Sequence, residues 1–410
     1  MKSTMIIVSH VVNDAVTHGF VPAAKAMDLH VVLITDHKLS HLELASRDSH
    51  FNPDTILECD VFNPLEIIET ITENELKPDA IFSNSDHLQT STAICAQFFG
   101  LPAKDWSVTL KAKNKHLTRQ VLNEKALPNT QSCLLHRHSN VALGMAFPVV
   151  AKPKEGVASL DVQRCDSQSE LDAYCDAFWQ KHPNAAILVE QFLQGPLVTL
   201  ETLGDGERLI AVGGFDVSLS EPPYFIETAA DWNGPNGIAH REACLAHREA
   251  CLAQLKAFGV GFGVCHSEFI ITGNGPVLVE INYRSIGDGR EFLLNNLAHF
   301  GWFSTILGLH LGRRLDGDYQ IHGSAHVHYV VAEHSGVIDG DSTSFIQHDG
   351  DVITQQQVLK TAGELFQQSY SNKDYLARIS IVSPSGQNLD QALQNALNNF
   401  NLAPTREVAA

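Results

Sequence analysis

Two glutamates and an asparagine surround one tight turn in the segment SEFIITGNGPVLVEINYR. The TGNGP sequence predicts a turn, and the β-branched and apolar runs on either side predict strands, so we expect a β-hairpin centred on Asn274. In this register Glu268 lies opposite Glu280 and His266 lies opposite Asn282, with all four side chains on one face. Directly opposed carboxylates repel each other, and a hard divalent cation with oxygen ligands would relieve the repulsion. The alternative is an exposed hairpin face that carries two unrelated surface glutamates.

Two lysines occupy positions suited to binding phosphate. Lys115 is in the first turn of a predicted helix, and Lys152 ends the predicted strand FPVVAK directly before the sequence PKEGVAS. Phosphate groups require positive charge and flexible backbone N–H donors. Either lysine alone is more typical of a solvated side chain. Together with the hairpin they form a set that fits a nucleotide, with lysines for its phosphates, and carboxylates and an amide for Mg²⁺.

A third element is the stretch ILVEQFLQGP, in which a strand runs directly into a Glu–Gln–Phe–Leu connection. Such a connection offers backbone hydrogen-bonding groups beside apolar side chains, and an adenine ring can use both. An ordinary strand end is the alternative interpretation.

The N-terminal part of the chain predicts a parallel sheet. The runs MIIVSHVV, LHVVLITD and DAIFSNSD read as buried strands, and amphipathic segments such as NPLEIIETITENEL lie between them. Ligands of such sheets bind beyond the carboxyl ends of the strands, where Asp36, Ser83, Ser85 and Asp86 are found. Simple capping of the strand ends is the alternative. The sequence GxGxxG is absent, so a dinucleotide site has little support.

Composition excludes several classes of protein. The chain has 410 residues and a formal net charge of −19 without a cluster of basic residues, so neither one small domain nor a nucleic-acid partner is expected. The eight cysteines are scattered without a CxxC motif, which indicates reduced thiols and a cytoplasmic location. The N-terminus reads as a first strand instead of a signal peptide, and no run of about 18 apolar residues predicts a membrane span.

Two further features have a structural interpretation. The sequence HREACLA occurs twice in tandem, at 240–246 and 247–253, and a heptad repeat presents nearly the same face twice, so we expect one packed helix there. His326 and His328 share one face of a predicted strand, as metal ligands can, but a structural role is the better interpretation.

The order of these motifs along the chain closely resembles that of the ATP-grasp superfamily. A lysine at a helix start is followed by FPVVAKPxxGxxS, then VEQFLxGP and a later glutamate, then SEF and VLVEINYR. The resemblance implies an α/β fold with α+β elements: an N-terminal parallel-sheet domain, a two-lobed nucleotide cleft and a small C-terminal domain. The implied boundaries are 1–105 for the first domain, 106–312 for the ATP-grasp domain with a lid lobe at about 146–195, and 313–410 for the last.

The resemblance also implies roles for individual residues. Arg284 and Lys152 would be catalytic, with Arg284 contacting the transferred phosphate or a substrate carboxylate. Two Mg²⁺ ions, with Mn²⁺ as an alternative, would be held by Glu268, Glu280 and Asn282. The residues implied to bind ATP are Lys115, Lys152, Ser159, Glu190, Gln191, Phe192, Leu193 and Glu201.

The glycine-rich loop after the second lysine departs from the superfamily pattern. The sequence KPKEGVASLDV keeps Gly156 and Ser159 but has Asp161 where a last glycine is expected. Because Asp161 has a Cβ and a negative charge, we expect this loop to close less tightly over the phosphates.

The activity implied is that of an ADP-forming carboxylate–amine ligase acting through an acylphosphate, with small-molecule carboxylate and amine substrates and a possible homodimer. We expect an amino acid as one substrate, in siderophore or dipeptide synthesis. Arg284 and Arg290 could each grip a carboxylate, although Arg290 also suits a plain helix start, and the loop Phe225–Gly237 resembles one that reaches toward substrate. The rivals are a biotin-carboxylase-like or purine-pathway carboxylase, and a non-catalytic nucleotide-binding regulator.

Overall fold

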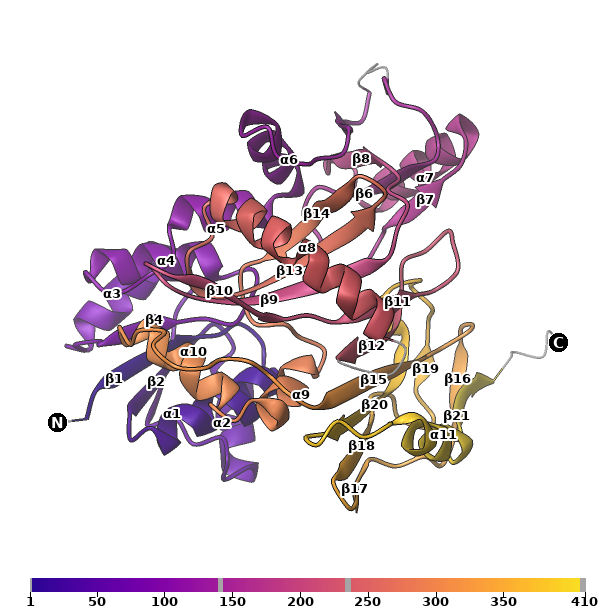
Figure 1. Ribbon diagram of the computed structural model, residues 1–410. Helices are drawn as coiled ribbons and strands as arrows, with labels where there is room; N and C mark the ends of the chain where they lie inside the picture. The colour runs from indigo at the N-terminus through magenta and orange to yellow at the C-terminus, as the bar shows by residue number, and fades with distance from the viewer. Residues whose placement is uncertain (1, 139–142, 233–236, 406–410) are drawn as a thin grey trace.

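The computed structural model describes residues 2–138, 143–232 and 237–405, with backbone only for 237–246. Four sheets organise this part of the chain. Figure 1 shows the N-terminal sheet, the lobe of residues 132–191 that corresponds to the predicted lid lobe, and a small C-terminal sheet, with one large sheet between them that extends into the C-terminal part of the chain.

The N-terminal sheet is parallel, with strand order β3-β2-β1-β4, as the sequence predicts. Alternate residues of β1 enter different cores: Met5 and Ile7 pack on one face, and Ile6 and Val8 pack on the other. Both faces are therefore covered, which explains the unbroken apolar runs. The strands are β1 (Thr4–Val8), β2 (His30–Thr35), β3 (Thr55–Glu58) and β4 (Ala80–Phe82). The helical segments of this part are the π-helix η1 (Ala15–Phe20), α1 (Val21–Ala26), α2 (Lys38–Arg47), α3 (Pro64–Glu73) and α4 (Gln89–Phe98).

Two helices connect this sheet to an antiparallel lobe. Asn114 caps α6 (Lys115–Glu124) directly after α5 (Trp106–Lys113), and its side chain accepts from the N–H groups of His116 and Leu117. Lys115 is thereby fixed at the first helical position. The lobe has strand order β5-β8-β6-β7 and its own core under α7 (Gln168–Lys181). Its strands are β5 (Ser132–Leu135), β6 (Val149–Pro153), β7 (Gln163–Cys165) and β8 (Ile187–Gln191).

The central sheet is continuous from the hairpin strands to the C-terminal part of the chain. Its order is β14-β13-β9-β11-β12-β15-β20-β18-β17, with β10 paired to β9. β12 pairs with β15, so this sheet continues across the boundary predicted at residue 313. The domain limit itself stays a prediction. The strands are β9 (Leu197–Asp205), β10 (Leu209–Gly213), β11 (Asp216–Leu219), β12 (Glu227–Trp232), β13 (Phe262–Thr272), β14 (Gly275–Asn282), β15 (Ser324–Val331), β17 (Phe345–Asp349), β18 (Val352–Val358) and β20 (Tyr375–Ser383).

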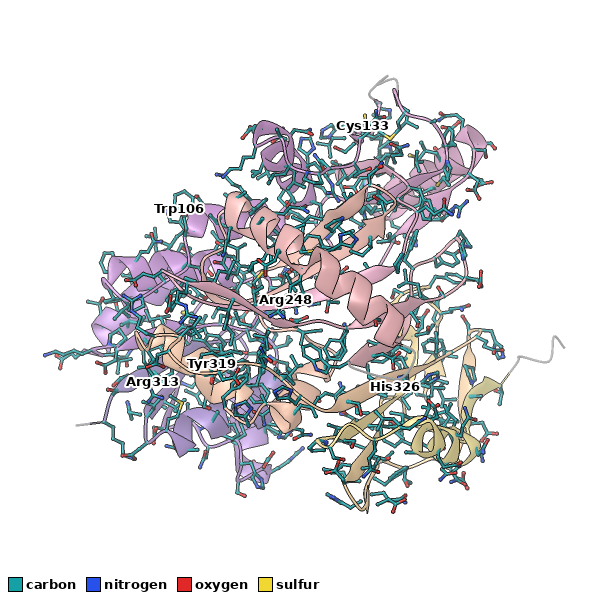
Figure 2. All side chains as sticks on the ribbon, viewed as in Figure 1. Trp106, Cys133, Arg248, Arg313, Tyr319 and His326 are labelled. Carbon is teal, nitrogen blue, oxygen red and sulfur yellow. The ribbon has the colours of Figure 1, made fainter. Side chains whose placement is uncertain are left out.

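The remaining elements cover this sheet or extend its C-terminal end. The duplicated heptads form one helix, α8, as predicted. In the second copy Cys251 and Leu252 are buried, and Arg248, labelled in Figure 2, donates to the Ala211 carbonyl. The side chains of the first copy lie outside those described. A small antiparallel sheet has order β19-β16-β21. The bounds are α8 (Gly237–Phe258), α9 (Arg290–Leu297), α10 (Trp302–His310), β16 (Gly336–Gly340), β19 (Leu365–Phe366), the 3₁₀ turn η2 (Asn372–Asp374), α11 (Asp390–Asn398) and β21 (Leu402–Thr405). No helix of the described residues is long and apolar enough to cross a membrane.

Close backbone approach between β9 and β11 depends on Gly214. A Cβ built there would lie 1.8 Å from the Thr199 carbonyl oxygen, so we expect Gly214→Ala to lower the free energy of unfolding by about 2–3 kcal/mol. Gly273→Ala is the matched control, because a Cβ at that turn position meets nothing within 4 Å. Urea unfolding of both variants checks this, and equal stabilities would contradict it.

Candidate functional site

The hairpin forms in the register that places the two glutamates opposite each other. Glu268 pairs with Glu280, and His266 pairs with Asn282. The turn itself is tighter than predicted, with Thr272 opposite Gly275, and a bulge between Glu268 and Phe269 restores the predicted pairing further along the strands. The four side chains therefore share one face of the ladder, as the sequence predicts.

Each glutamate has a cationic neighbour within the protein. Lys115 Nζ lies 2.9 Å from Glu280 Oε1, and His266 Nε2 lies 3.6 Å from Glu268 Oε1. His266 Nδ1 also bonds at 2.7 Å to Glu201 Oε1. Burial opposes the charge on His266, but Glu201 outweighs burial and raises the pKa of His266 to about 9. Burial likewise opposes ionisation of Glu268, and hydrogen bonding and charge from His266 nevertheless lower its pKa. The cations that relieve the repulsion in this structure are thus side chains.

A second charged cluster joins α6 to the lid lobe. Arg119 Nε and Lys152 Nζ each lie 2.6 Å from one oxygen of Glu190, and all three side chains are nearly inaccessible to solvent. Burial disfavours the charge on Glu190, but Arg119 and Lys152 lower its pKa to about 2. Burial lowers the pKa of Lys152, and repulsion from Arg119, which shares the Glu190 carboxylate, acts in the same direction. A phosphate group beside Lys152 would supply the missing negative charge.

The loop after Lys152 contains three non-glycine residues with positive φ within four positions of sequence. Ala158, Ser159 and Asp161 have φ values of 57°, 53° and 55°. Asp161 therefore adopts the left-handed conformation expected of the missing glycine, which aspartate tolerates better than most residues. Its carboxylate points toward α7, where Lys181 Nζ lies 3.6 Å away and His182 Nε2 lies 3.5 Å away. The structure thus directs the charge of Asp161 to another helix.

A cavity of about 340 Å³ lies between the hairpin, this loop and the strands of the central sheet. It brings together every site residue implied by the sequence except Glu201, which is fully buried behind His266. Both charged clusters open into it. The sequence-implied residues that line it are Lys115, Lys152, Ser159, Glu190, Gln191, Phe192, Leu193, Glu268, Glu280, Asn282 and Arg284.

The edge formed by the connection after β8 has the chemistry that an adenine ring requires. The Gln191 N–H donates to Gln131 O at 3.0 Å, and the Phe192 N–H donates to Pro148 O at 3.1 Å. No hydrogen bond is formed by the Leu193 N–H within the described residues, and Leu193 and Phe192 both line the cavity. One free donor beside an apolar surface fits a heteroaromatic base.

The cavity is also lined by two arginines, Arg284 and Arg290, and by two further acids, Glu227 and Asp288. The Arg290 N–H donates to Gly287 O at 3.2 Å, and Arg284 Nη1 lies 3.7 Å from the position of a Cβ at Gly287, so both arginines border one turn. Arg290 Nη1 lies 2.8 Å from Glu227 Oε2. Asn372, from the C-terminal part of the chain, also lines the cavity.

The residues present fit magnesium. Glu268, Glu280 and Asn282 offer oxygen donors on one strand face at the cavity wall, and Mg²⁺ prefers carboxylate and carbonyl oxygen ligands. Lys115 and His266 occupy part of the charge role that bound ions would take.

Other candidates from the sequence lie outside this cavity or pair within the protein. Asp86 pairs with Lys113, and His10 Nδ1 lies 2.8 Å from Asp36 Oδ2. Trp232 is buried edge-on against Phe215, so it is a packing residue. His326, labelled in Figure 2, bonds through Nδ1 to Asp231 at 2.8 Å, which confirms the structural interpretation. Residues 233–236 of the expected substrate loop lie outside those described, whereas Phe225 and Glu227 line the cavity.

The structure adds four residues to which the sequence assigned no role. They line the cavity or pair with residues that line it, and they are Arg119, His266, Glu227 and Asn372. The sequence offers a local pattern for two of them. Arg119 follows other basic residues near a predicted helix start, and His266 lies on the predicted hairpin face. Glu227 and Asn372 had no such signal. They meet across 145 positions of sequence, where Asn372 Oδ1 accepts from the Glu227 N–H at 3.0 Å.

Comparison with known proteins defines the fold. No family model matches the chain. It is similar to the L-amino acid ligase of Bacillus licheniformis, with a TM-score of 0.76, 18% identity and 98% of each chain covered. It is also similar to phosphoribosylglycinamide synthetase from Anaerococcus prevotii (TM-score 0.71, 13% identity, 99% of this chain and 100% of that one). The chain therefore has the ATP-grasp fold that its motif order predicts.

Curated relatives match only part of their length. The uncharacterized protein y4rH of Sinorhizobium fredii is 26% identical over 255 residues, which are 60% of this chain and 51% of that protein. Carnosine synthase 1 of Gallus gallus is 28% identical over 244 residues, which are 54% of this chain and 26% of the synthase. The chain thus spans about half of the first relative and about a quarter of the second.

The Arg119–Glu190–Lys152 cluster makes a strong stability prediction. Glu190→Gln leaves two buried cations without a counter-charge, so we expect the free energy of unfolding to fall by about 3 kcal/mol or more. Glu155→Gln is the matched control, because its carboxylate is half exposed beside Lys154 and should contribute less than about 1 kcal/mol. Denaturant unfolding without nucleotide measures both, and similar losses would refute the cluster's role.

The pair of His266 and Glu201 predicts a pH-dependent stability. The folded pKa of His266, about 9, exceeds the unfolded value of about 6.5, so its contribution is complete below pH 6.5 and is lost as pH rises through 9. The stability difference between the native protein and His266→Gln should shrink by about 3 kcal/mol between pH 6 and pH 10.

The measurement is denaturant unfolding in chelator at each pH, so that metal does not bind Glu268. His299→Gln, which replaces an exposed histidine, is the control and should follow the native protein throughout. A pH-independent difference for His266→Gln would show that the buried pair is not charged as described.

Proposed function

We propose that this protein is an ATP-dependent carboxylate–amine ligase that forms ADP and phosphate. The observation that carries the proposal is the single cavity in which the opposed glutamates, the two lysines and Arg284 meet. The overall structural similarity to an L-amino acid ligase supports an amino acid as one substrate. Small-metabolite synthesis, of a dipeptide or siderophore kind, in the cytoplasm and by a homodimer belongs to the same proposal.

The reaction has two steps, and the chain's residues position and neutralise charge in both. A carboxylate oxygen attacks the γ-phosphorus of ATP, the bond to the β,γ-bridging oxygen breaks, and ADP leaves. An amine then attacks the acyl carbon, phosphate leaves with the carbon–oxygen electron pair, and the nitrogen loses a proton. Lys152 and Lys115 would hold the phosphates, and Arg284 would neutralise the group in transfer. Mg²⁺ ions held by the hairpin would supply further neutralisation of phosphate oxygens.

ADP release from the purified protein tests the proposal over a matrix of carboxylic acids crossed with amines and amino acids. A ligase gives ADP and phosphate in equal amounts that depend on one acid–amine pair, requires divalent metal, and is restored by Mg²⁺ or Mn²⁺ after chelation. Bicarbonate-stimulated release without any amine would indicate a carboxylase instead. Binding of nucleotide without turnover for any pair would indicate a regulator.

The hairpin assignment predicts the effect of one substitution. Glu280→Gln should lower turnover more than about 100-fold, because it removes a charged oxygen from the proposed metal site. Circular dichroism and the unfolding midpoint show whether the variant is folded. Glu207→Gln, on an exposed turn beside Arg314, is the control and should retain full turnover. Unchanged turnover in a folded Glu280→Gln protein would refute the assignment.

A further inference from the structure

One largely buried acid of the cavity belongs neither to the Arg119–Glu190–Lys152 cluster nor to the hairpin residues proposed to hold Mg²⁺. Glu227 begins β12 at the arginine end of the cavity, and its side chain is 14% exposed. Its partners are Arg290, at 2.8 Å, and the Asn372 amide, whose Nδ2 donates to Oε1 at 3.4 Å. A buried carboxylate is costly unless it is paired, so its position at a cavity wall calls for explanation.

The backbone of Glu227 is held by the C-terminal part of the chain on both sides. Its N–H donates to Asn372 Oδ1 at 3.0 Å, and its carbonyl accepts from the Tyr375 hydroxyl at 2.9 Å. The turn opposite is held in the same way, because the Tyr329 hydroxyl donates to Asp288 O at 3.1 Å. The acid and the arginine turn are therefore fixed relative to each other, as a ligand site requires.

Glu227 and Arg290 both line the cavity, and the hydrogen-bonding capacity of the pair is not filled, because buried Glu227 Oε2 has no hydrogen-bond partner among the described residues although it lies 2.8 Å from Arg290 Nη1. Arg290 is 3% exposed, and its buried Nε has no hydrogen-bond partner among the described residues. A carboxylate can accept about four hydrogen bonds, and two neighbours contact that of Glu227. A ligand ammonium group can therefore bind Glu227 while Arg290 remains in place.

We propose that Glu227 binds the ammonium group of an amino acid whose carboxylate is phosphorylated, and thereby selects amino carboxylates over simple carboxylates. The inference rests on the proposed ligase function. An amino acid differs from a simple carboxylic acid by an ammonium group close to the reacting carboxylate. A fixed buried acid, in the same cavity as Arg284, is placed to detect that difference.

Asp288 is the competing acid. It lines the same cavity and lies 3.9 Å from Arg290 Nη2, but its side chain is 51% exposed. Water screens an exposed carboxylate, so it discriminates less between charged and neutral ligands. Asp288→Asn removes the same charge, and asparagine tolerates the positive φ of 57° at this position.

The test separates acid activation from amine choice. Hydroxylamine replaces the amine substrate: its nitrogen attacks the acylphosphate carbon and loses a proton, phosphate leaves, and a hydroxamate forms, which is measured as its coloured iron(III) complex. The probes are amino acids paired with their deaminated counterparts: alanine and β-alanine with propionate, leucine with 4-methylpentanoate, and phenylalanine with 3-phenylpropionate. The full chain is assayed with Mg-ATP as the native protein, Glu227→Gln, Glu227→Asp, Asp288→Asn and the distant Glu207→Gln.

The native protein should activate its preferred amino acid about 10- to 100-fold better, in kcat/KM, than the deaminated counterpart. Glu227→Gln should lose this preference through the amino acid alone, with hydroxamate formation from the simple carboxylate retained, which also shows that the variant is folded. Glu227→Asp keeps the charge but withdraws it by one methylene, so it should retain part of the preference. Glu207→Gln should behave as the native protein.

Three results would overturn the proposal. The first is equal kcat/KM of the native protein for both members of each pair. The second is an equal loss of kcat/KM for both members in Glu227→Gln. The third is a loss of the amino acid preference in Asp288→Asn but not in Glu227→Gln. If Glu227→Gln does not fold, the native protein and Glu227→Asp decide. If no carboxylate gives hydroxamate, the ligase function itself fails, and calorimetry of alanine against propionate with Mg-ADP then tests the ammonium site separately.

Discussion

Two carboxylates directly opposite each other on the β13–β14 ladder repel, and much of the structure around them supplies the counter-charge. Lys115 reaches Glu280 because Asn114 fixes the first turn of α6, and His266 reaches Glu268 because the two residues are two positions apart on one strand face. Glu201 then compensates His266 from the next strand. Lys115 comes from α6 and Glu201 from β9, so the hairpin, α6 and β9 must assemble together for these charges to be balanced.

The same logic extends to the lid lobe. Arg119 binds Glu190 of the lobe and also donates to the carbonyls of Leu278 and Val279, at 2.6 and 3.0 Å. Val279 is the residue left without a partner by the bulge, so this guanidinium satisfies a carbonyl that the ladder cannot. One buried side chain thus links the two lobes at the hairpin. The link depends on Arg119 as arginine, because Nε, Nη1 and Nη2 reach separate acceptors from one rigid planar group, whereas the three donors of a lysine all leave a single nitrogen.

The fold was predictable from the sequence wherever the signals were local. Continuous apolar runs indicated β1, β2 and β4, the TGNGP turn indicated the hairpin, and the tandem heptads indicated α8. The hairpin register was right for an incomplete reason: centring it on Asn274 ignored the bulge, and a tighter turn and one extra residue compensate each other. The site residues that the motifs implied all line the cavity except Glu201, and their roles stay predictions.

The rest could not be predicted, because it depends on contacts between distant segments. Arg119 meets Glu190 across 71 positions, and Glu227 meets Asn372 across 145. No spacing rule connects such residues. The continuity of the central sheet through β12 and β15 has the same origin, because strand pairing across a long connection leaves no local pattern.

The loop after Lys152 shows how the structure accommodates Asp161 where the superfamily pattern has glycine. A non-glycine residue with positive φ costs about 1 kcal/mol, and Ala158, Ser159 and Asp161 all have such φ values. The Asn372 N–H donates to Ala158 O at 3.0 Å, and the Tyr174 hydroxyl donates to Asp161 O at 2.6 Å. The loop is therefore held from the C-terminal part of the chain on one side and from α7 on the other. Glycine would adopt the same backbone at lower cost, but only a side chain can attach the loop to Lys181 and His182. The aspartate thus exchanges loop freedom for attachment to the end of α7, toward which its carboxylate points.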